Sequence, residues 1–232
     1  MTGATKIKKI KFESIFDFYN PLVSSKLSVP QWYKDIRRWV GDKPKIYPNR
    51  NTTMKHCMPL FDAITTGYQI TLPFDLIVEQ INNKPNLTWL GDSSLIVKRP
   101  KNIFEPMPTP VGFSSEMYGI VIPLSFSLPK GYSFLFTQPM NRFDLPTMTM
   151  SAVVDADLEI YAGEAPLFIK EGFEGIIEQG TPIAQILPFK REDWKAVEAK
   201  GLNKKAELNK KRSISVISGW YKSNGWKRKT YE

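Results

Sequence analysis

The feature that most constrains the fold is a change of pattern at Phe61. From there to Arg191 the sequence consists of short apolar or alternating segments that Gly, Pro and Asn interrupt. β-Branched and aromatic residues are common in these segments, which have the length of strands. The predicted strands are Tyr68–Leu72, Asp75–Ile81, Thr88–Leu90, Ser94–Lys98, Ile120–Phe126, Ser133–Phe136, Thr147–Val154, Leu167–Ile169, Phe173–Ile177 and Ala184–Pro188. So many short strands predict a mainly β fold, either a barrel or a jelly-roll-like sandwich.

The first part of the chain has another pattern. Residues 1–54 are predicted to form an N-terminal arm and linker. Ser28, two residues before Pro30, is a favourable N-cap for one short helix. Helical spacing places three large side chains of this helix near one face, which we expect to pack on the core: Trp32, Ile36 and Trp39. Residues 55–190 are then the predicted β-barrel core.

After the last predicted strand the pattern becomes helical. Residues 191–232 are predicted to form a basic C-terminal extension, with helix around Glu192–Lys211 and a short strand at Ile214–Ile217. The proline-rich segment Asn102–Pro110 is expected to be an extended loop or a crossing arm. A chain of 232 residues can bury one sizeable core, so we expect one globular domain with two extensions.

The composition excludes several kinds of site. Cys57 is the only cysteine and His56 the only histidine, so an intrachain disulfide is excluded and a structural zinc site lacks ligands. Neighbours on a strand point to opposite faces, which disfavours a catalytic Cys-His pair. No apolar run approaches the roughly 18 residues of a membrane span and no leader pattern is present. We therefore expect no membrane partner and a cytoplasmic protein.

The formal net charge is +9, and much of the excess lies at the two ends of the chain. Clustered Lys and Arg attract nucleic acid because they release counterions from phosphates. Aromatic residues interleave with the basic tail and would add stacking: Trp220, Tyr221 and Trp226. A solvated basic tail on a near-neutral domain is the simpler interpretation. Nucleic acid bound through the basic termini stays an open hypothesis.

Four motifs follow one another in the second half of the chain. A Pro-Lys-Gly-Tyr turn at 129–132 precedes Thr-Gln-Pro-Met-Asn-Arg at 137–142, Val-Val-Asp-Ala-Asp-Leu at 153–158 and Gly-Thr-Pro-Ile-Ala-Gln at 180–185. Their order resembles the barrels of deoxyuridine triphosphatases (dUTPases) and deoxycytidine triphosphate deaminases. This resemblance implies a dUTPase-like β-barrel and a homo-oligomer, for which a trimer is the candidate state.

Most of the middle of the chain also resembles uncharacterised proteins of phage and marine viral genomes. The stretches that carry this second resemblance are Cys57–Ala63, Phe136–Arg142 and Gly180–Arg191. It adds no activity, but it implies a viral type of protein, for which the expected location is the host-cell cytoplasm.

The resemblance to dUTPases implies a set of candidate site residues. Gln185 would contact nucleotide phosphate, and Asp155 would lie at the sugar and the catalytic water. Arg142, with Asn141 beside it, would bind phosphate, since a guanidinium can make a bidentate contact. Asp155 and Asp157, two residues apart, could share Mg²⁺ as the cofactor of a bound nucleotide. The alternatives are that Gln185 satisfies backbone groups and that the acidic pair is a solvated turn.

The departures from the family pattern weigh against full catalysis. The phosphate loop lacks its serine pair, Leu158 stands where a tyrosine is expected, and no Gly-Phe-Gly-Ser-Thr-like tail follows. Without these donors a triphosphate would be poorly neutralised. The preferred hypothesis is a viral-type binding or assembly protein without the full catalytic motif set. The alternative is a nucleotide-directed hydrolase, similar to a nucleoside triphosphate diphosphohydrolase, with a remodelled site.

Overall fold

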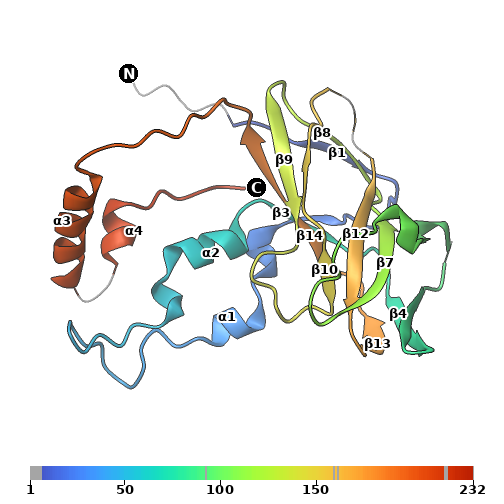
Figure 1. Cartoon of the computed structure of the whole chain (residues 1–232), viewed down its shortest axis with the longest axis horizontal. Helices are drawn as coiled ribbons and strands as arrows, with labels where there is room; N and C mark the ends of the chain where they lie inside the picture. Colours follow the sequence, from blue (N-terminus) through green and yellow to red (C-terminus); the bar gives the residue numbers. More distant parts are fainter. Residues whose placement is uncertain (1–6, 92, 159, 161, 217–218, 232) are drawn as a thin grey trace.

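The computed structural model describes residues 7–91, 93–158, 160, 162–216 and 219–231. Its strands pair antiparallel throughout and gather in one body, while the C-terminal helices lie away from it (Figure 1). The largest sheet has the order β11 (Ala152–Val154), β9 (Tyr132–Thr137), β14 (Pro182–Lys190), β3 (Tyr68–Thr71), β2 (Leu22–Ser24). The second has the order β10 (Thr147–Thr149), β12 (Glu164–Lys170), β7 (Phe113–Val121), β6 (Ile96–Arg99).

Two smaller sheets complete the β body. One has the order β13 (Gly175–Ile177), β4 (Leu76–Ile81), β5 (Lys84–Thr88), and the other pairs β1 (Lys11–Ser14) with β8 (Leu124–Ser127). The predicted mainly β class is confirmed. The sheets of the described residues do not close into a single barrel.

The helices are short and few. The α-helices are α1 (Gln31–Asp35), α2 (Met58–Thr65), α3 (Leu202–Ile214) and α4 (Trp220–Asn224). Single 3-10 turns occur at Ser25–Ser28, Met54–His56, Ser93–Leu95 and Lys101–Ile103. No helix in the described part of the chain is long and apolar enough to cross a membrane.

One hydrophobic core joins all the sheets. Alternate residues of a strand point to the same side, so Leu76 and Val78 of β4 are buried together, as are Leu124 and Phe126 of β8. The same cluster includes residues of the two larger sheets, among them Ile70, Ile120, Phe134, Leu167 and Ile186. Strands β9 and β14, which position the candidate site, both contribute side chains to this shared core.

Several predicted strands are divided or shifted in the structure. Ile120–Phe126 was expected to be one strand, but β7 ends at Val121 and β8 begins at Leu124. Pro123 lies between them, and a proline cannot donate to a β ladder. Thr147–Val154 likewise divides into β10 and β11, which join different sheets. The strand expected at Thr88–Leu90 is wrong, because β5 ends at Thr88.

The predicted helices also need correction. Helix α1 begins at Gln31 after Pro30 and ends at Asp35, because Ile36 is already extended with a ψ of 121°. Trp39 is therefore outside the helix, where it forms an isolated bridge with Thr52.

The C-terminal helix begins later than expected. Residues 192–200 have no regular structure, and α3 starts only at Leu202. Ile214, predicted to begin a strand, is the last residue of α3, and Ile217 lies outside the described residues.

The C-terminal extension leaves the β body and returns to it. Every residue from 191 to 212 is exposed, and α3 has no buried residue. On the return path the indole Nε1 of Trp226 donates to both carboxylate oxygens of Asp62 on α2, at 3.1 and 2.9 Å. Lys229 forms an ion pair with the same carboxylate. The segment between Arg191 and Trp226 is thus an excursion that is fixed at both ends, and we call it the C-terminal arm (Figure 1).

Candidate functional site

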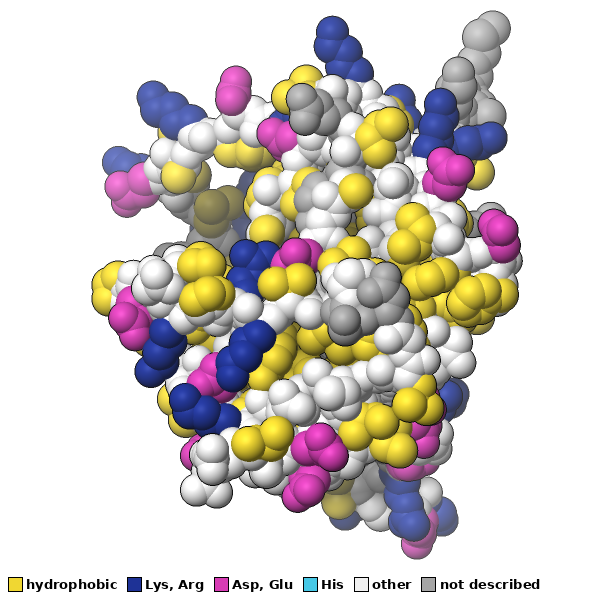
Figure 2. Space-filling model, turned by 90° about the vertical axis from the view of Figure 1, so that its right-hand side faces the viewer, with side chains coloured by type: hydrophobic (Ala, Val, Ile, Leu, Met, Phe, Trp, Pro, Cys, Tyr) yellow, Lys and Arg dark blue, Asp and Glu magenta, His cyan; other side chains and the backbone are white. Residues whose placement is uncertain are grey.

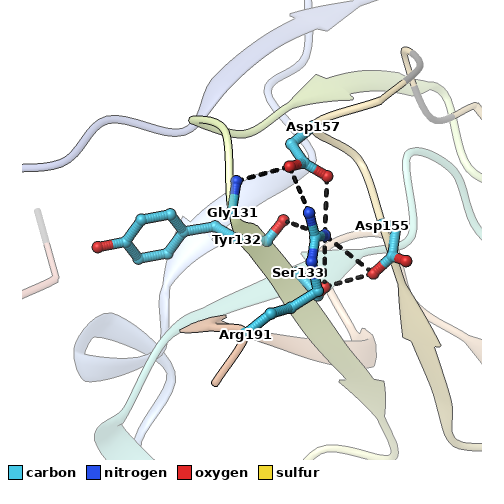
Figure 3. Close-up of polar contacts among 6 residues, drawn as sticks. All are labelled: Gly131, Tyr132, Ser133, Asp155, Asp157 and Arg191. Carbon is cyan, nitrogen blue, oxygen red and sulfur yellow. Dashed lines mark hydrogen bonds and ion pairs between the residues drawn. The ribbon is translucent and has the colours of Figure 1, made fainter. Parts of the chain in front are cut away.

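Asp155 and Asp157 follow β11, and the structure brings both to Arg191, the residue after β14. Strand β9 lies between β11 and β14, so its first residues complete the cluster (Figure 3). Arg191 Nη1 is 2.8 Å from Asp157 Oδ1, and Nη2 is 2.5 Å from Oδ2. Nη1 also lies 3.1 Å from Asp155 Oδ1. One guanidinium therefore bridges the two carboxylates.

The start of β9 contributes further contacts to this cluster. The Gly131 N–H donates to Asp157 Oδ2 at 2.7 Å, and the Ser133 hydroxyl donates to Asp155. Arg191 Nη1 donates to the Tyr132 carbonyl at 3.1 Å and to Ser133 Oγ at 3.0 Å. The Asp157 side chain is buried among these contacts, whereas the Asp155 side chain stays about half exposed, at 51%.

The electrostatics of the pair follow from these contacts. Hydrogen bonds from Arg191 lower the pKa of Asp157 to about 2; the Gly131 N–H adds to this shift, which outweighs the loss of solvation. The Asp157 carboxylate in turn raises the pKa of the Arg191 guanidinium. A divalent cation placed on this pair would meet a guanidinium already bound there. Within the described residues, no group of three or more His, Cys, Asp or Glu could hold a metal ion.

Gln185 lies in the middle of β14 and is fully buried. Its Nε2 donates to the carbonyls of Ala63 and Thr66 at 3.0 and 2.6 Å, and its Oε1 accepts from the Met140 N–H at 2.8 Å. The side chain thus ties the end of α2 to the loop after β9. All three of these contacts are to backbone groups. They correspond to the second role considered for Gln185, which is to satisfy backbone groups and not to bind phosphate.

Arg142 and Asn141 lie in the loop after β9. Arg142 binds Asp144 through Nε, at 2.9 and 3.1 Å from the two oxygens, and through Nη2 at 2.8 Å. Partial burial would raise the pKa of Asp144, but hydrogen bonds from Arg142 and from Trp32 of α1 lower it overall. Asn141 has a φ of 59°, in the left-handed region that Asn tolerates better than most residues.

A groove of about 550 Å³ runs beside this loop. Its lining includes Asn141, Arg142 and Lys170, with apolar side chains around them: Val111, Phe113, Met140, Phe143, Leu145 and Met148. The groove offers cationic and amide groups at the edge of an apolar surface. Two of the predicted phosphate-binding residues, Asn141 and Arg142, therefore line this groove.

The five predicted site residues lie in two places. Ser133, beside Asp155, and Thr137, where the loop begins, are four residues apart on β9. At about 3.3 Å per residue the two places are roughly 13 Å apart along the strand. Asn141 and Arg142 lie in the loop after β9, which the buried Gln185 contacts only through the Met140 N–H, and the acidic pair lies at the other place. Sequence reasoning did not single out Arg191, although it ends the Gly180–Arg191 stretch.

Of three comparisons with known proteins, only the one with solved structures gave matches. No family model matches the sequence, and no curated protein does either. Among solved structures, a variant dUTPase of Staphylococcus bacteriophage 80alpha, solved with dUpNHpp, is 11% identical over 83% of this chain and 88% of its own, with a TM-score of 0.34. A variant dUTPase of phage phi11 of S. aureus, described with a structural Mg(II) ion, is 8% identical over 83% of this chain and 97% of its own, with a TM-score of 0.36.

These matches name one of the enzyme families that the motifs of residues 128–191 resemble. At TM-scores of 0.34 and 0.36 they carry no argument about the activity of this chain. Its function has to be inferred from its own residues.

Proposed function

We propose that this chain is a viral-type binding or assembly protein without nucleotide hydrolysis. The observation that carries the proposal is that the polar groups expected to work on a nucleotide are bound to partners within the chain. Asp155 and Asp157 bind Arg191, while Gln185 binds three backbone groups. Hydrolysis would require these groups to be free to orient water, metal and phosphate.

Exposed apolar side chains support assembly from several copies. Hydrophobic side chains gather in the middle of the face that Figure 2 shows, with charged side chains mostly around them. Large apolar residues of the β body that stay exposed include Ile81, Val111, Phe143 and Ile176. The arrangement of an apolar centre and a charged rim is typical of interfaces between subunits. We infer a homo-oligomer, with a trimer as the candidate state.

Two measurements test this proposal. Light scattering at micromolar concentration should give a mass of two or more chains of 26.6 kDa, and a mass near one chain would contradict assembly. Incubation with deoxyuridine and deoxycytidine triphosphates and Mg²⁺ should release no pyrophosphate or ammonia. Steady turnover that Asp155→Asn abolishes would overturn the non-catalytic proposal.

A second candidate function rests on the groove beside the loop after β9. Asn141, Arg142 and Lys170 line this groove and could bind an anion, which favours a nucleotide-directed hydrolase with Mg²⁺ and a remodelled site. A thermal-shift screen of nucleoside mono-, di- and triphosphates with Mg²⁺ separates the two candidates. Stabilisation that Arg142→Ala removes, and that Lys130→Ala on a distant turn keeps, would favour the second. No stabilisation by any of them would exclude it.

A further inference from the structure

The positive charge of the protein is concentrated in the C-terminal arm and the tail after it. Residues 201–232 hold nine Lys and Arg against two Glu. Helix α3 alone has Lys204, Lys205, Lys210, Lys211 and Arg212, with Glu207 as its one acidic residue. In the part of the chain that the structure describes, none of these five cations forms an ion pair, whereas Lys229 after the arm binds Asp62. The helix therefore presents charge that the chain itself does not neutralise.

Aromatic rings lie beside these cations. A hollow of about 620 Å³ between α3 and α4 is lined by Lys210, Arg212, Trp220 and Tyr221, with small polar residues completing it. The Tyr221 side chain is about half exposed, at 49%. The hollow thus combines cationic groups of α3 with two aromatic rings of α4, of which Tyr221 is exposed and Trp220 partly exposed.

Arg50, in the N-terminal segment of residues 1–54, holds the C-terminal end of α3. Arg50 Nη2 donates to the Ser213 carbonyl at 2.8 Å and to the Val216 carbonyl at 2.6 Å. A cation at this position compensates the negative end of the helix dipole and satisfies carbonyls that lack helical partners. Helix α3, which lines the hollow, is therefore attached to the N-terminal part of the chain through Arg50 and is not part of a free tail.

We propose that α3 and α4 form a binding site for single-stranded nucleic acid. Phosphates would contact the unpaired Lys and Arg side chains, and bases would stack on Trp220 and Tyr221. Stacking of this kind needs unpaired bases, which favours a single strand over a duplex. This inference is independent of the proposed assembly role, because the residues involved lie outside the β body.

A membrane surface fits the same charge less well. An interfacial helix needs an apolar stripe opposite its charged face. Leu202, Leu208 and Ile214 of α3 follow one another at intervals of six residues, which at about 100° per residue puts them about 120° apart around the helix and not on one side. The helix therefore lacks a stripe that could enter lipid.

The test uses the full chain and a fluorescein-labelled 20-nucleotide oligothymidine in anisotropy titrations. We expect binding that weakens steeply between 50 and 200 mM salt, with quenching of tryptophan fluorescence. The variant K210A/K211A/R212A should bind at least tenfold more weakly, and its log–log salt slope should fall by about 2, since each lost phosphate contact removes about 0.7. W220A/Y221A should weaken binding and remove most of the quenching.

The control K11A/K101A/K130A removes the same charge from exposed positions of the β body and should bind within twofold of the unchanged protein. An equal loss in this control would overturn the proposal, because it would show attraction by net charge alone. Binding to phosphatidylserine vesicles without binding to the oligonucleotide would also overturn it. Circular dichroism of each variant should show unchanged folding. Light-scattering mass is read in parallel, so failure of assembly and failure of nucleic-acid binding are distinguishable.

Discussion

At the scale of single residues, Arg191 determines what the acidic pair can do. Its guanidinium reaches both carboxylates and the backbone of Tyr132. An Asp pair two residues apart is a common source of Mg²⁺ ligands, but a bound arginine supplies the positive charge in its place. The pair consequently joins the ends of β11, β9 and β14 to one another.

The Asp157 ion pair predicts a dependence of stability on acid. The folded pKa of about 2 is below the ordinary value near 3.8, so the stabilisation is complete above about pH 4 and is lost as the pH falls toward 2. D157N should therefore unfold at a lower temperature than the unchanged protein at pH 6, and the difference should shrink toward pH 2. Thermal unfolding followed by circular dichroism at several pH values measures this. A difference that stays constant with pH would contradict the ion pair.

Tyr118 predicts the opposite dependence, at high pH. Burial, with a smaller contribution from the Glu116 charge, raises its pKa to about 12, and its hydroxyl donates to the Pro85 carbonyl. Because the unfolded pKa is near 10, this stabilisation is complete below pH 10 and is lost as the pH rises toward 12. Y118F should cost about 0.5–1.5 kcal/mol at pH 7 and reduce the loss of stability above pH 10. Denaturant unfolding at pH 7 and pH 11 tests both expectations.

Substitution of Gln185 distinguishes the two roles considered for it, binding phosphate and satisfying backbone groups. Q185A would leave the Met140 N–H and two carbonyls without their partner in a fully buried site, so we expect a loss of about 2–4 kcal/mol in the free energy of unfolding. Q31A, which removes an exposed hydrogen bond on α1, should change it by less than about 0.5 kcal/mol. Denaturant titration measures both variants. Full stability of Q185A with loss of nucleotide binding would instead assign the phosphate role.

From the sequence, only site residues that are close together in the chain or share a motif could be placed near one another. The spacing of Asp155 and Asp157 was enough to place them together. Their partner Arg191 is 34 residues from Asp157 and meets it only because β9 lies between β11 and β14. Two of the three partners of Gln185, the carbonyls of Ala63 and Thr66, lie at the end of α2, more than a hundred residues away in sequence. Contacts of this range depend on strand order, which no local pattern encodes.

At the scale of elements, strands with clear alternation were the most predictable. Predicted strands overlap β3, β4, β9, β12 and β14, where apolar and β-branched residues repeat on one face. Strands β1 and β2 and helix α2 were not predicted. The first two are only four and three residues long, and α2 contains Pro59 and an apolar run that also suits a strand. Elements this short depend on tertiary contacts for their stability.

Helix α2 predicts how the C-terminal arm is attached. Asp62 accepts from Trp226 and forms an ion pair with Lys229, so D62A should release the end of the chain. A hydrogen bond to a charged group contributes about 1.5–3 kcal/mol, which corresponds to roughly tenfold or greater opening of this segment. Limited trypsin digestion should cut D62A faster after residues 227–229. D35A, whose carboxylate accepts an exposed bond on α1, should be cut at the unchanged rate, and equal rates for D62A would contradict the attachment.

At the scale of the whole molecule, both the N-terminal and the C-terminal extension make contacts with the β body. Residues 1–54, predicted as an arm and linker, supply β1 and β2 to two sheets. Near the other end, the Tyr231 ring lies 6.0 Å from Tyr68 of β3, edge to face, and the Tyr231 carbonyl accepts from Ser24. Charge and composition separated these segments from the core in the sequence. Their return to the core could not be predicted, because it depends on pairing over the full length of the chain.

The two ends of the described chain also meet. Ile7, Ile10, Lys229 and Tyr231 line one groove of about 790 Å³, so the path of the chain is close to a ring. A circular permutant, with the native ends joined by a short Gly-Ser linker and new ends in the exposed, irregular segment 192–200, should fold with a melting temperature within a few degrees of the native order. New ends between Ala184 and Gln185 would divide β14 and should prevent folding. Success of the first permutant would mean that the order in which these segments are synthesised is not required for the fold.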